Sequence, residues 1–293
     1  MPAAPVPLSA RPVHEARALV GESPLWDARE GLLWWTDIPR GELHGFDPAT
    51  GRDALRAVFP GPLSAVALRA SGGLLLALGD TLAGYRPERG GEPEPLARVR
   101  LPGPDQRLND GRCDPEGRFW VGGMSTAGAS GAAALHRLDG TSLTTELTGV
   151  SISNGLDWSP DGRLAYYADS PTREVAVYDR TGPALRRTGT LARVTDGVPD
   201  GLTVDAEGGV WVALFGGYAV HRYLPDGTLA AVVEVPAAKV TSCAFGGPAL
   251  ETLYLTTASR GLTGAELREQ PLAGSLFACA PGVRGLPAHA FAG

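Results

Sequence analysis

The amino-acid sequence predicts an all-β fold, a six-bladed β-propeller, on two observations. Turn-forming residues are frequent, with 40 Gly and 25 Pro among 293 residues, and one pattern of apolar and turn residues occurs six times along the chain. Each copy has an apolar stretch, an Asp- or Gly-centred turn and a strand-like run rich in aromatic or β-branched residues. A repeat of about 44 residues is typical of the four-stranded blade of a propeller.

A glycine in the turn of each repeat defines the period. The repeats read LWDAREGLLWWTD, VALRASGGLLLAL, RCDPEGRFWVGG, LDWSPDGRLAYYAD, LTVDAEGGVWVAL and CAFGGPALETLYLT. The turn glycines are Gly31, Gly73, Gly117, Gly162, Gly208 and Gly247, at intervals of 42, 44, 45, 46 and 39 residues. Tight turns need positions with positive φ, which Gly, Asn and Asp adopt at low cost.

The strands within the repeats predict how the ring closes. The fourth repeat contains four strand-like runs, LDWS, RLAYYAD, EVAVYD and ALRRTGTLA, separated by Pro, Gly, Asp and Ser turns. The last repeat lacks a strand after SLFACA, whereas residues 13–20 form a spare one before the first repeat. Pairing the spare strand into the final blade would remove an exposed edge. We therefore expect one domain over residues 1–293, closed by an N-terminal strand in the last blade, with residues 1–12 as a loose N-terminal arm.

Composition excludes several classes of protein. The formal charge is −6, from 26 Lys plus Arg against 32 Asp plus Glu, which disfavours a nucleic-acid partner. We find no signal peptide or membrane span, so we expect a cytoplasmic location and no membrane partner. The cysteines Cys113, Cys243 and Cys279 are more than thirty residues apart without a C-x-x-C pair, so we expect buried thiols rather than a zinc knuckle or disulfide framework.

Other catalytic motifs are missing from the sequence. It has no G-x-S-x-G nucleophile elbow, no phosphate-binding G-x-x-x-x-G-K and no H-E-x-x-H. The histidines show no metal-ligand spacing; they are His14, His44, His136, His221 and His289. A histidine-based triad is therefore not expected.

The repeat phase predicts a ring of polar side chains at one end of the channel, because the innermost strands of all blades begin there. Eight residues before the turn glycines of repeats three to six lie Asn109, Asn154, Asp200 and Lys239. Glu22 lies nine residues before Gly31, a difference that a longer first turn could absorb. Only the second repeat has an apolar residue at this phase, with Ser64 beside it.

Three residues of this ring form a candidate cation site. Glu22, Asn154 and Asp200 supply two carboxylates and an amide carbonyl, which are hard oxygen donors that suit Ca²⁺, Mg²⁺ or Mn²⁺. Two like charges held close together are costly unless a cation lies between them. The alternative is structural: the same side chains could cap the inner strands and hydrogen-bond one another across a wet channel.

Four motifs, GESPLW, RLNDGRCDPEGRFWVGGM, SNGLDWSPDGRLAYYADS and VPDGLTVDAEGGVWVA, resemble the gluconolactonase family that includes regucalcin, or senescence marker protein. The resemblance extends over essentially the whole chain from about residue 13. It implies a six-bladed propeller with one divalent cation in the channel, held by Glu22, Asn154 and Asp200. Ca²⁺ is the expected cofactor, with Zn²⁺, Mn²⁺ or Mg²⁺ as alternatives. The resemblance also implies that Arg107 and Asn109 bind a small-molecule sugar lactone and that Asp200 is the general base.

One departure from the family bears on substrate choice. The family carries a Glu shortly after its G-T-M motif, whereas this chain reads GGMSTAGASGAAA, with Ala127 near that place. The predicted function is a metal-dependent hydrolase that opens a sugar lactone to its aldonic acid by water attack on a metal-polarised carbonyl. Two alternatives stay open: a calcium-dependent ester or phosphotriester hydrolase on the same propeller, and a non-catalytic propeller that serves as a binding module.

Overall fold

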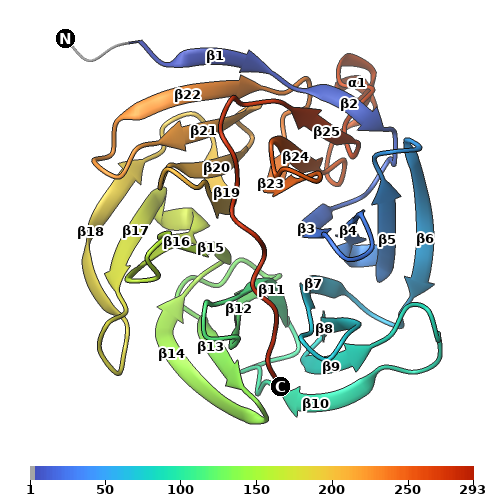
Figure 1. The fold of residues 1–293 in the computed structure, drawn as a ribbon, viewed down its shortest axis with the longest axis vertical. Helices are drawn as coiled ribbons and strands as arrows, with labels where there is room; N and C mark the ends of the chain where they lie inside the picture. The colour runs from blue at the N-terminus through green and yellow to red at the C-terminus, as the bar shows by residue number, and fades with distance from the viewer. Residues whose placement is uncertain (1–3) are drawn as a thin grey trace.

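The computed structural model describes residues 4–293, and this part of the chain forms six antiparallel blades around a central channel (Figure 1). Apart from the strands contributed by the N-terminal segment, the strands of each blade run outward from the channel in chain order. Blade one contains β3 (Gly21–Asp27), β4 (Leu32–Asp37), β5 (Glu42–Asp47) and β6 (Arg52–Val58). Blade two contains β7 (Leu63–Leu68), β8 (Leu74–Leu78), β9 (Thr81–Tyr85) and β10 (Glu94–Arg98). Blade three contains β11 (Gln106–Cys113), β12 (Phe119–Ser125), β13 (Ala133–Asp139) and β14 (Ser142–Val150).

The second half of the ring repeats this arrangement, so the predicted fold class is confirmed. Blade four contains β15 (Ser153–Trp158), β16 (Leu164–Asp169), β17 (Glu174–Asp179) and β18 (Arg186–Arg193). Blade five contains β19 (Val198–Val204), β20 (Val210–Phe215), β21 (Ala219–Tyr223) and β22 (Leu229–Glu234). Blade six contains β23 (Val240–Gly246), β24 (Thr252–Thr257) and β25 (Leu276–Cys279), with an N-terminal strand outside them.

That N-terminal strand closes the ring as predicted, but it comprises residues 11–14 rather than the expected 13–20, of which residues 15–19 form no strand. β2 (Arg11–His14) pairs antiparallel with β25 and becomes the outermost strand of the last blade. Before it, β1 (Val6–Ser9) pairs parallel with β22 as a fifth strand of blade five. The expectation of a loose arm is therefore wrong for residues 6–12, because the unpaired backbone groups of two blade edges hold this segment. Residues 1–3 of the expected arm lie outside the described residues.

The predicted turn glycines adopt the conformation that the sequence pattern requires. All six have φ between 66° and 84°, the left-handed region that disfavours side chains with a Cβ. Gly73 is the most constrained sterically, because a Cβ there would lie 2.5 Å from the carbonyl oxygen of Tyr85. The turns between first and second strands thus set the register of each blade.

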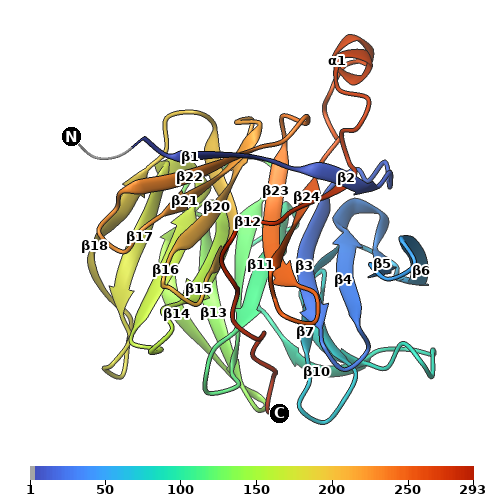
Figure 2. The same ribbon diagram turned by 45° about the horizontal axis from the view of Figure 1, so that its top comes forward.

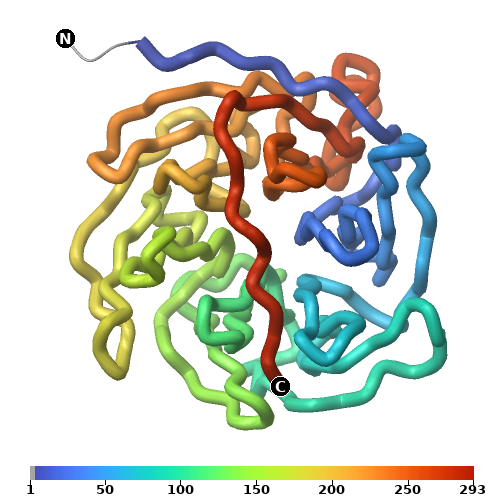
Figure 3. The backbone as a smooth tube through the Cα atoms, viewed as in Figure 1, coloured from blue at the N-terminus to red at the C-terminus, as the bar shows by residue number. Residues whose placement is uncertain are grey.

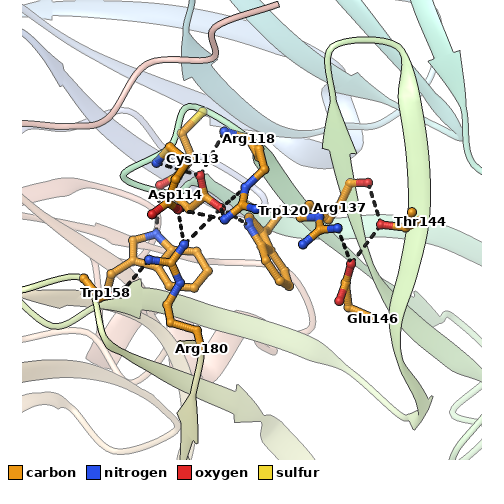
Figure 4. Close-up of polar contacts among 11 residues, drawn as sticks. Cys113, Asp114, Arg118, Trp120, Arg137, Thr144, Glu146, Trp158 and Arg180 are labelled. Atoms are coloured by element: carbon orange, nitrogen blue, oxygen red, sulfur yellow. Dashed lines mark hydrogen bonds and ion pairs between the residues drawn. The ribbon is translucent and has the colours of Figure 1, made fainter. Parts of the chain in front are cut away.

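Neighbouring blades pack through bulky side chains of their first and second strands. Trp120 on β12 and Trp158 on β15 lie with ring centroids 5.3 Å apart, and both are buried. Beside them, Asp114 accepts hydrogen bonds from Trp120 Nε1 at 2.8 Å and Arg118 Nε at 2.7 Å, while the guanidinium of Arg180 stacks 4.8 Å from the Trp158 ring (Figure 4). The polar groups of this cluster hydrogen-bond one another, and the cluster joins blade three to blade four.

All three cysteines are buried and free, as expected.

Two short 3-10 helices follow the second strands of blades one and four. They are η1 (Ile38–Arg40) and η2 (Ser170–Thr172), each with a Pro as second residue and an Asp before it. The preceding Asp37 accepts hydrogen bonds from the backbone of Leu19 and Val20, and Asp169 does the same for Ser151 and Ile152. The two aspartates therefore fix the chain just before β3 and β15 in pseudo-symmetric fashion.

One face of the propeller carries a small helix. α1 (Gly264–Glu269) lies between β24 and β25 and projects beyond the blades (Figure 2). The Arg260 N–H before it donates to the carbonyl of Leu19, just ahead of β3, so α1 lies on the face where the inner strands begin. A capping box of Thr263 and Glu266 starts the helix. Within residues 4–293, no helix is long and apolar enough to cross a membrane.

The C-terminal segment crosses the opposite face and covers the other end of the channel (Figure 3). Backbone hydrogen bonds hold it near both of its ends: among them, the Gly285 N–H donates to Leu250 O at 2.8 Å, and the Phe291 N–H donates to Leu68 O at 2.7 Å. Between them, residues 286–289 line a cavity of about 380 Å³ together with the ends of the inner strands. This segment does not cross the face with the starts of the inner strands.

Candidate functional site

A β-bulge near the start of every inner strand forms the ring of channel side chains. The residues in these bulges are Ser23 with Pro24, Ser64, Asn109 with Asp110, Asn154 with Gly155, Asp200 with Gly201, and Thr241. A bulge bends its strand and re-aims a side chain that regular pairing would direct elsewhere. Six bulges at one level of six pseudo-symmetric strands therefore collect side chains that are distant in the sequence.

The predicted site residues lie at these inner-strand starts. Glu22, Asn109, Asn154 and Asp200 are buried, with 5%, 6%, 6% and 7% of their surface exposed. Lys239 does not belong to the ring: it precedes β23, and its Nζ donates to Arg260 O at 2.7 Å. Thr241 takes its place, because β23 runs directly up to Gly247 and leaves fewer residues between bulge and turn.

Several polar side chains of the ring link neighbouring blades, as the structural alternative expects. Each donates to the carbonyl that precedes the ring residue of the next blade. The bonds are Ser64 Oγ to Leu108 O at 2.6 Å, Asn109 Nδ2 to Ser153 O at 2.8 Å, Ser170 Oγ to Pro199 O at 2.6 Å and Thr241 Oγ1 to Gly21 O at 2.5 Å. In blade four the donor is Ser170 from η2 and not the ring residue Asn154, which instead hydrogen-bonds Ser170 and Asn109.

Hydrogen bonding fixes the orientation of both ring amides. Arg107 can only donate, and its Nη1 lies 2.7 Å from Asn109 Oδ1, so the amide nitrogen of Asn109 must face the other way. That nitrogen donates to Asn154 Oδ1 at 2.9 Å. Asn154 Oδ1 keeps one lone pair, since a carbonyl oxygen accepts two hydrogen bonds.

The two carboxylates of the ring, in contrast, have few partners. Glu22 Oε2 accepts the Ser23 N–H at 2.8 Å, and within residues 4–293 no side chain donates to Glu22 or Asp200. Burial, followed by the negative charge of Asp110, raises the pKa of Glu22 to about 8. The hydrogen bond from Ser23 and the positive charge of Arg107 lower this pKa by less. Burial and then the charge of Glu22 raise the pKa of Asp200 well above its ordinary value. Glu22 and Asp200 are therefore near enough for their like charges to interact, and Asp110 adds a third negative charge beside them.

This donor set fits a hard divalent cation. Two buried carboxylates that repel each other are stabilised by a positive charge between them, and the free lone pair of Asn154 Oδ1 adds a third oxygen. No group of three or more His, Cys, Asp or Glu residues with metal-binding geometry occurs in the described part of the chain. The amide of Asn154 is thus essential to the candidate site, and the assignment of these three ligands stays a prediction.

Arg107 joins the candidate cation site to an open groove. Burial lowers the pKa of its guanidinium to about 10, against the raising effects of Glu22 and Asp200, so it is still a cation at neutral pH. It borders a groove of about 750 Å³ that also includes Thr126, at the start of the loop with Ala127. Ser125, which ends β12, pairs with Gln106 beside Arg107, so this loop leaves the blade at the site. The methyl group of Ala127 offers no carboxylate there.

Sequence reasoning missed two residues of this region. Asp110 shares the bulge of Asn109, and its charge raises the pKa of both Glu22 and Asp200. Its place in the LNDG motif was the signal that could have shown it. Ser170 hydrogen-bonds Asn154, yet it follows the second strand of its blade and shares no phase with the ring, so no count along the sequence could find it.

Its fold defines the chain as a six-bladed β-propeller with a candidate site where the inner strands begin. The chain belongs to the SMP-30/gluconolactonase/LRE-like family, whose model matches residues 20–259, so the resemblance of the four motifs is confirmed. Regucalcin from Xenopus laevis is 38% identical over 288 residues, covering 94% of this chain and 95% of that protein. A 6-deoxy-6-sulfogluconolactonase from Pseudomonas putida is 36% identical over 282 residues, covering 94% and 96%. A regucalcin structure from Agrobacterium tumefaciens str. C58, described as a calcium-binding protein, has a TM-score of 0.93 and 30% identity over 99% of both chains.

Proposed function

We propose that this protein is a metal-dependent hydrolase that opens a sugar lactone to its aldonic acid. The observation that supports the proposal is that Glu22, Asn154 and Asp200 are buried at the starts of three inner strands, and that within residues 4–293 no side chain donates to either carboxylate. Membership of a family with a named sulfogluconolactonase supports lactone hydrolysis.

Glu22, Asn154 and Asp200 would hold one divalent cation through their oxygen atoms. Calcium suits this all-oxygen set, and the calcium-binding relative supports it; Zn²⁺, Mn²⁺ and Mg²⁺ are the alternatives. When bound, such a cation supplies Lewis-acid polarisation of the lactone carbonyl and charge stabilisation as the ring opens.

Asp200 is the proposed general base. A neighbouring positive charge lowers the pKa of a carboxyl group, so loading of the site would ionise Asp200 and let it accept a proton from the attacking water. Its burial limits hydration of the carboxylate, which makes the group a better base than an exposed aspartate beside the same charge would be.

In substrate binding, Arg107 would donate hydrogen bonds and Asn109 would accept one. Arg107 uses Nη1 for Leu108 O and Asn109 Oδ1, which leaves the N–H groups of Nε and Nη2 for substrate oxygens. Asn109 uses both amide hydrogens for Ser153 O and Asn154 Oδ1, so it can only accept, from a substrate hydroxyl, through the second lone pair of Oδ1.

The test is a panel of aldonolactones assayed by acid release, after chelation and after addition of Ca²⁺, Mn²⁺, Mg²⁺ or Zn²⁺ singly. We expect metal to restore activity, and Asp200→Ala to lower kcat by about 10²-fold or more. Arg107→Ala should raise KM by a larger factor than it changes metal affinity, because Arg107 hydrogen-bonds Leu108 O and Asn109 Oδ1 and no candidate ligand directly; an equal loss of both would contradict its role. A protein fully active in chelator, or inactive with every lactone and metal, would refute the proposal.

The loop with Ala127 favours one alternative, an ester or phosphotriester hydrolase on the same site. Because Ala127 supplies no carboxylate, this loop has one acceptor fewer for the hydroxyl groups of a sugar substrate in the groove beside Arg107. Activity on aryl esters or phosphotriesters but on no lactone would select this alternative. A binding module that neither hydrolyses nor binds metal is disfavoured by the cost of two buried, repelling carboxylates.

A further inference from the structure

Ser170, the first residue of η2, lies between two of the three candidate ligands. Its hydroxyl is 2.7 Å from Asn154 Nδ2 and 2.6 Å from the carbonyl oxygen of Pro199, and the side chain is buried. We propose that Ser170 is a positioning residue of the cation site, which fixes the carbonyl oxygen of Asn154 toward the ion and ties it to the backbone before Asp200. This inference rests on the cation site of the proposed function.

The donor and acceptor roles follow from the chemistry of the three groups. A backbone carbonyl can only accept, so the single hydroxyl hydrogen of Ser170 is committed to Pro199 O. Only lone pairs of Oγ then face Asn154, which must present its NH₂ group to them. The amide is thereby locked with Oδ1 on the far side, toward Asn109 Nδ2. A rotated amide would place its nitrogen, which cannot bind a cation, where the ligand oxygen is needed.

The bond to Pro199 sets the spacing of ligands from different blades. Pro199 directly precedes the bulge residue Asp200 in blade five, whereas Asn154 belongs to blade four. One hydroxyl therefore contacts the first ligand and the peptide unit that carries the second. Partners that orient metal ligands in this way commonly contribute about tenfold to a hundredfold in metal affinity.

The pseudo-symmetric position in blade one provides an internal comparison. Ile38 begins η1 as Ser170 begins η2, and both follow an Asp and precede a Pro. Ile38 is buried and apolar, so the helical turn itself does not require a hydroxyl. The candidate ligand of blade one, Glu22, has two equivalent carboxylate oxygens and needs no choice of orientation. The hydroxyl occurs in the blade whose ligand is an amide.

Calcium titration of metal-free protein tests the inference without measuring activity. The dissociation constant is obtained by calorimetry with CaCl₂ alone, and folding is checked by circular dichroism. We expect Ser170→Ala to raise this constant about tenfold or more. The matched control is Ser64→Ala, since Ser64 makes the same kind of buried inter-blade bond, to Leu108 O at 2.6 Å, without contacting a ligand. The control should bind calcium within about twofold of the wild type.

Two further variants distinguish orientation from general stability. Ser170→Cys keeps the buried volume and weakens both hydrogen bonds, so it should also lose affinity and replaces the alanine variant if that one does not fold. Asn154→Asp presents two oxygens and no NH₂, so Ser170→Ala should cost much less affinity in that background. An equal loss in both backgrounds, or wild-type affinity in Ser170→Ala, would overturn the inference. A wild-type protein that binds no divalent cation would instead overturn the proposed function, and this inference with it.

Discussion

Removal of the charge on Glu22 should stabilise the metal-free protein and reduce the stabilisation that calcium gives it. Glu22→Gln keeps an oxygen for the Ser23 N–H, so the substitution removes the charge and little else. The pKa of Glu22 is raised from 4.5 to about 8, chiefly by burial. A raised carboxyl pKa favours the folded state fully below the unfolded value, and this contribution is lost as pH rises through the folded value. The wild type should therefore lose stability between about pH 4.5 and pH 8.

The magnitude follows from the same shift. A change of one pKa unit corresponds to about 1.4 kcal/mol, so the full cost of the ionised carboxylate above pH 8 is about 5 kcal/mol. At pH 7 the folded protein still holds most of the proton, and the cost is about 3 kcal/mol. Glu22→Gln should recover up to this amount in chelator, because a neutral amide has no charge to desolvate.

Urea unfolding in chelator at pH 7 and pH 9 measures the effect, with and without added calcium. The wild type should gain about 2.7 kcal/mol at a calcium concentration one hundred times its dissociation constant, and Glu22→Gln much less. Glu92→Gln, which alters an exposed carboxylate of the loop before β10, is the control and should change stability by less than about 0.5 kcal/mol. Unchanged or lower stability of metal-free Glu22→Gln would refute the claim that this carboxylate is buried without compensation.

Three other outcomes follow from the fold. Phe291→Ala should cost about 3–5 kcal/mol in urea unfolding, because Phe291 is fully buried and fixes the C-terminal segment; a loss under 1 kcal/mol would mean that the segment does not close the channel. Gly73→Ala should lower the thermal midpoint through the contact with Tyr85 O, whereas Gly51→Ala, at a turn with open space, should cost less. The three cysteines should react with a thiol reagent only on unfolding, because burial raises their pKa; rapid modification of the native protein would contradict this.

Much of the site could be predicted from the repeat. The starts of β3, β15 and β19 share a phase, so Glu22, Asn154 and Asp200 could be grouped before any coordinates were known. The phase argument failed at Lys239, because it assumes a constant number of residues between ring position and turn glycine. Blade six has a shorter interval, so Thr241 occupies the ring instead. The loose-arm prediction failed for a related reason: strand pairing of residues 6–12 depends on which blade edge is free.

The sequence alone determined the number of blades, the closure by an N-terminal strand and the ring positions of all blades but the sixth, because these depend on a period that residue spacing records. The tertiary structure decided which ring members are bonded and which are free. Ser64, Asn109 and Thr241 form hydrogen bonds between blades. Within residues 4–293, no side chain donates a hydrogen bond to the carboxylates of Glu22 and Asp200. It also brought Ser170 against Asn154. Hydrogen-bond direction and desolvation depend on distances between blades, and these distances exist only once the ring has closed.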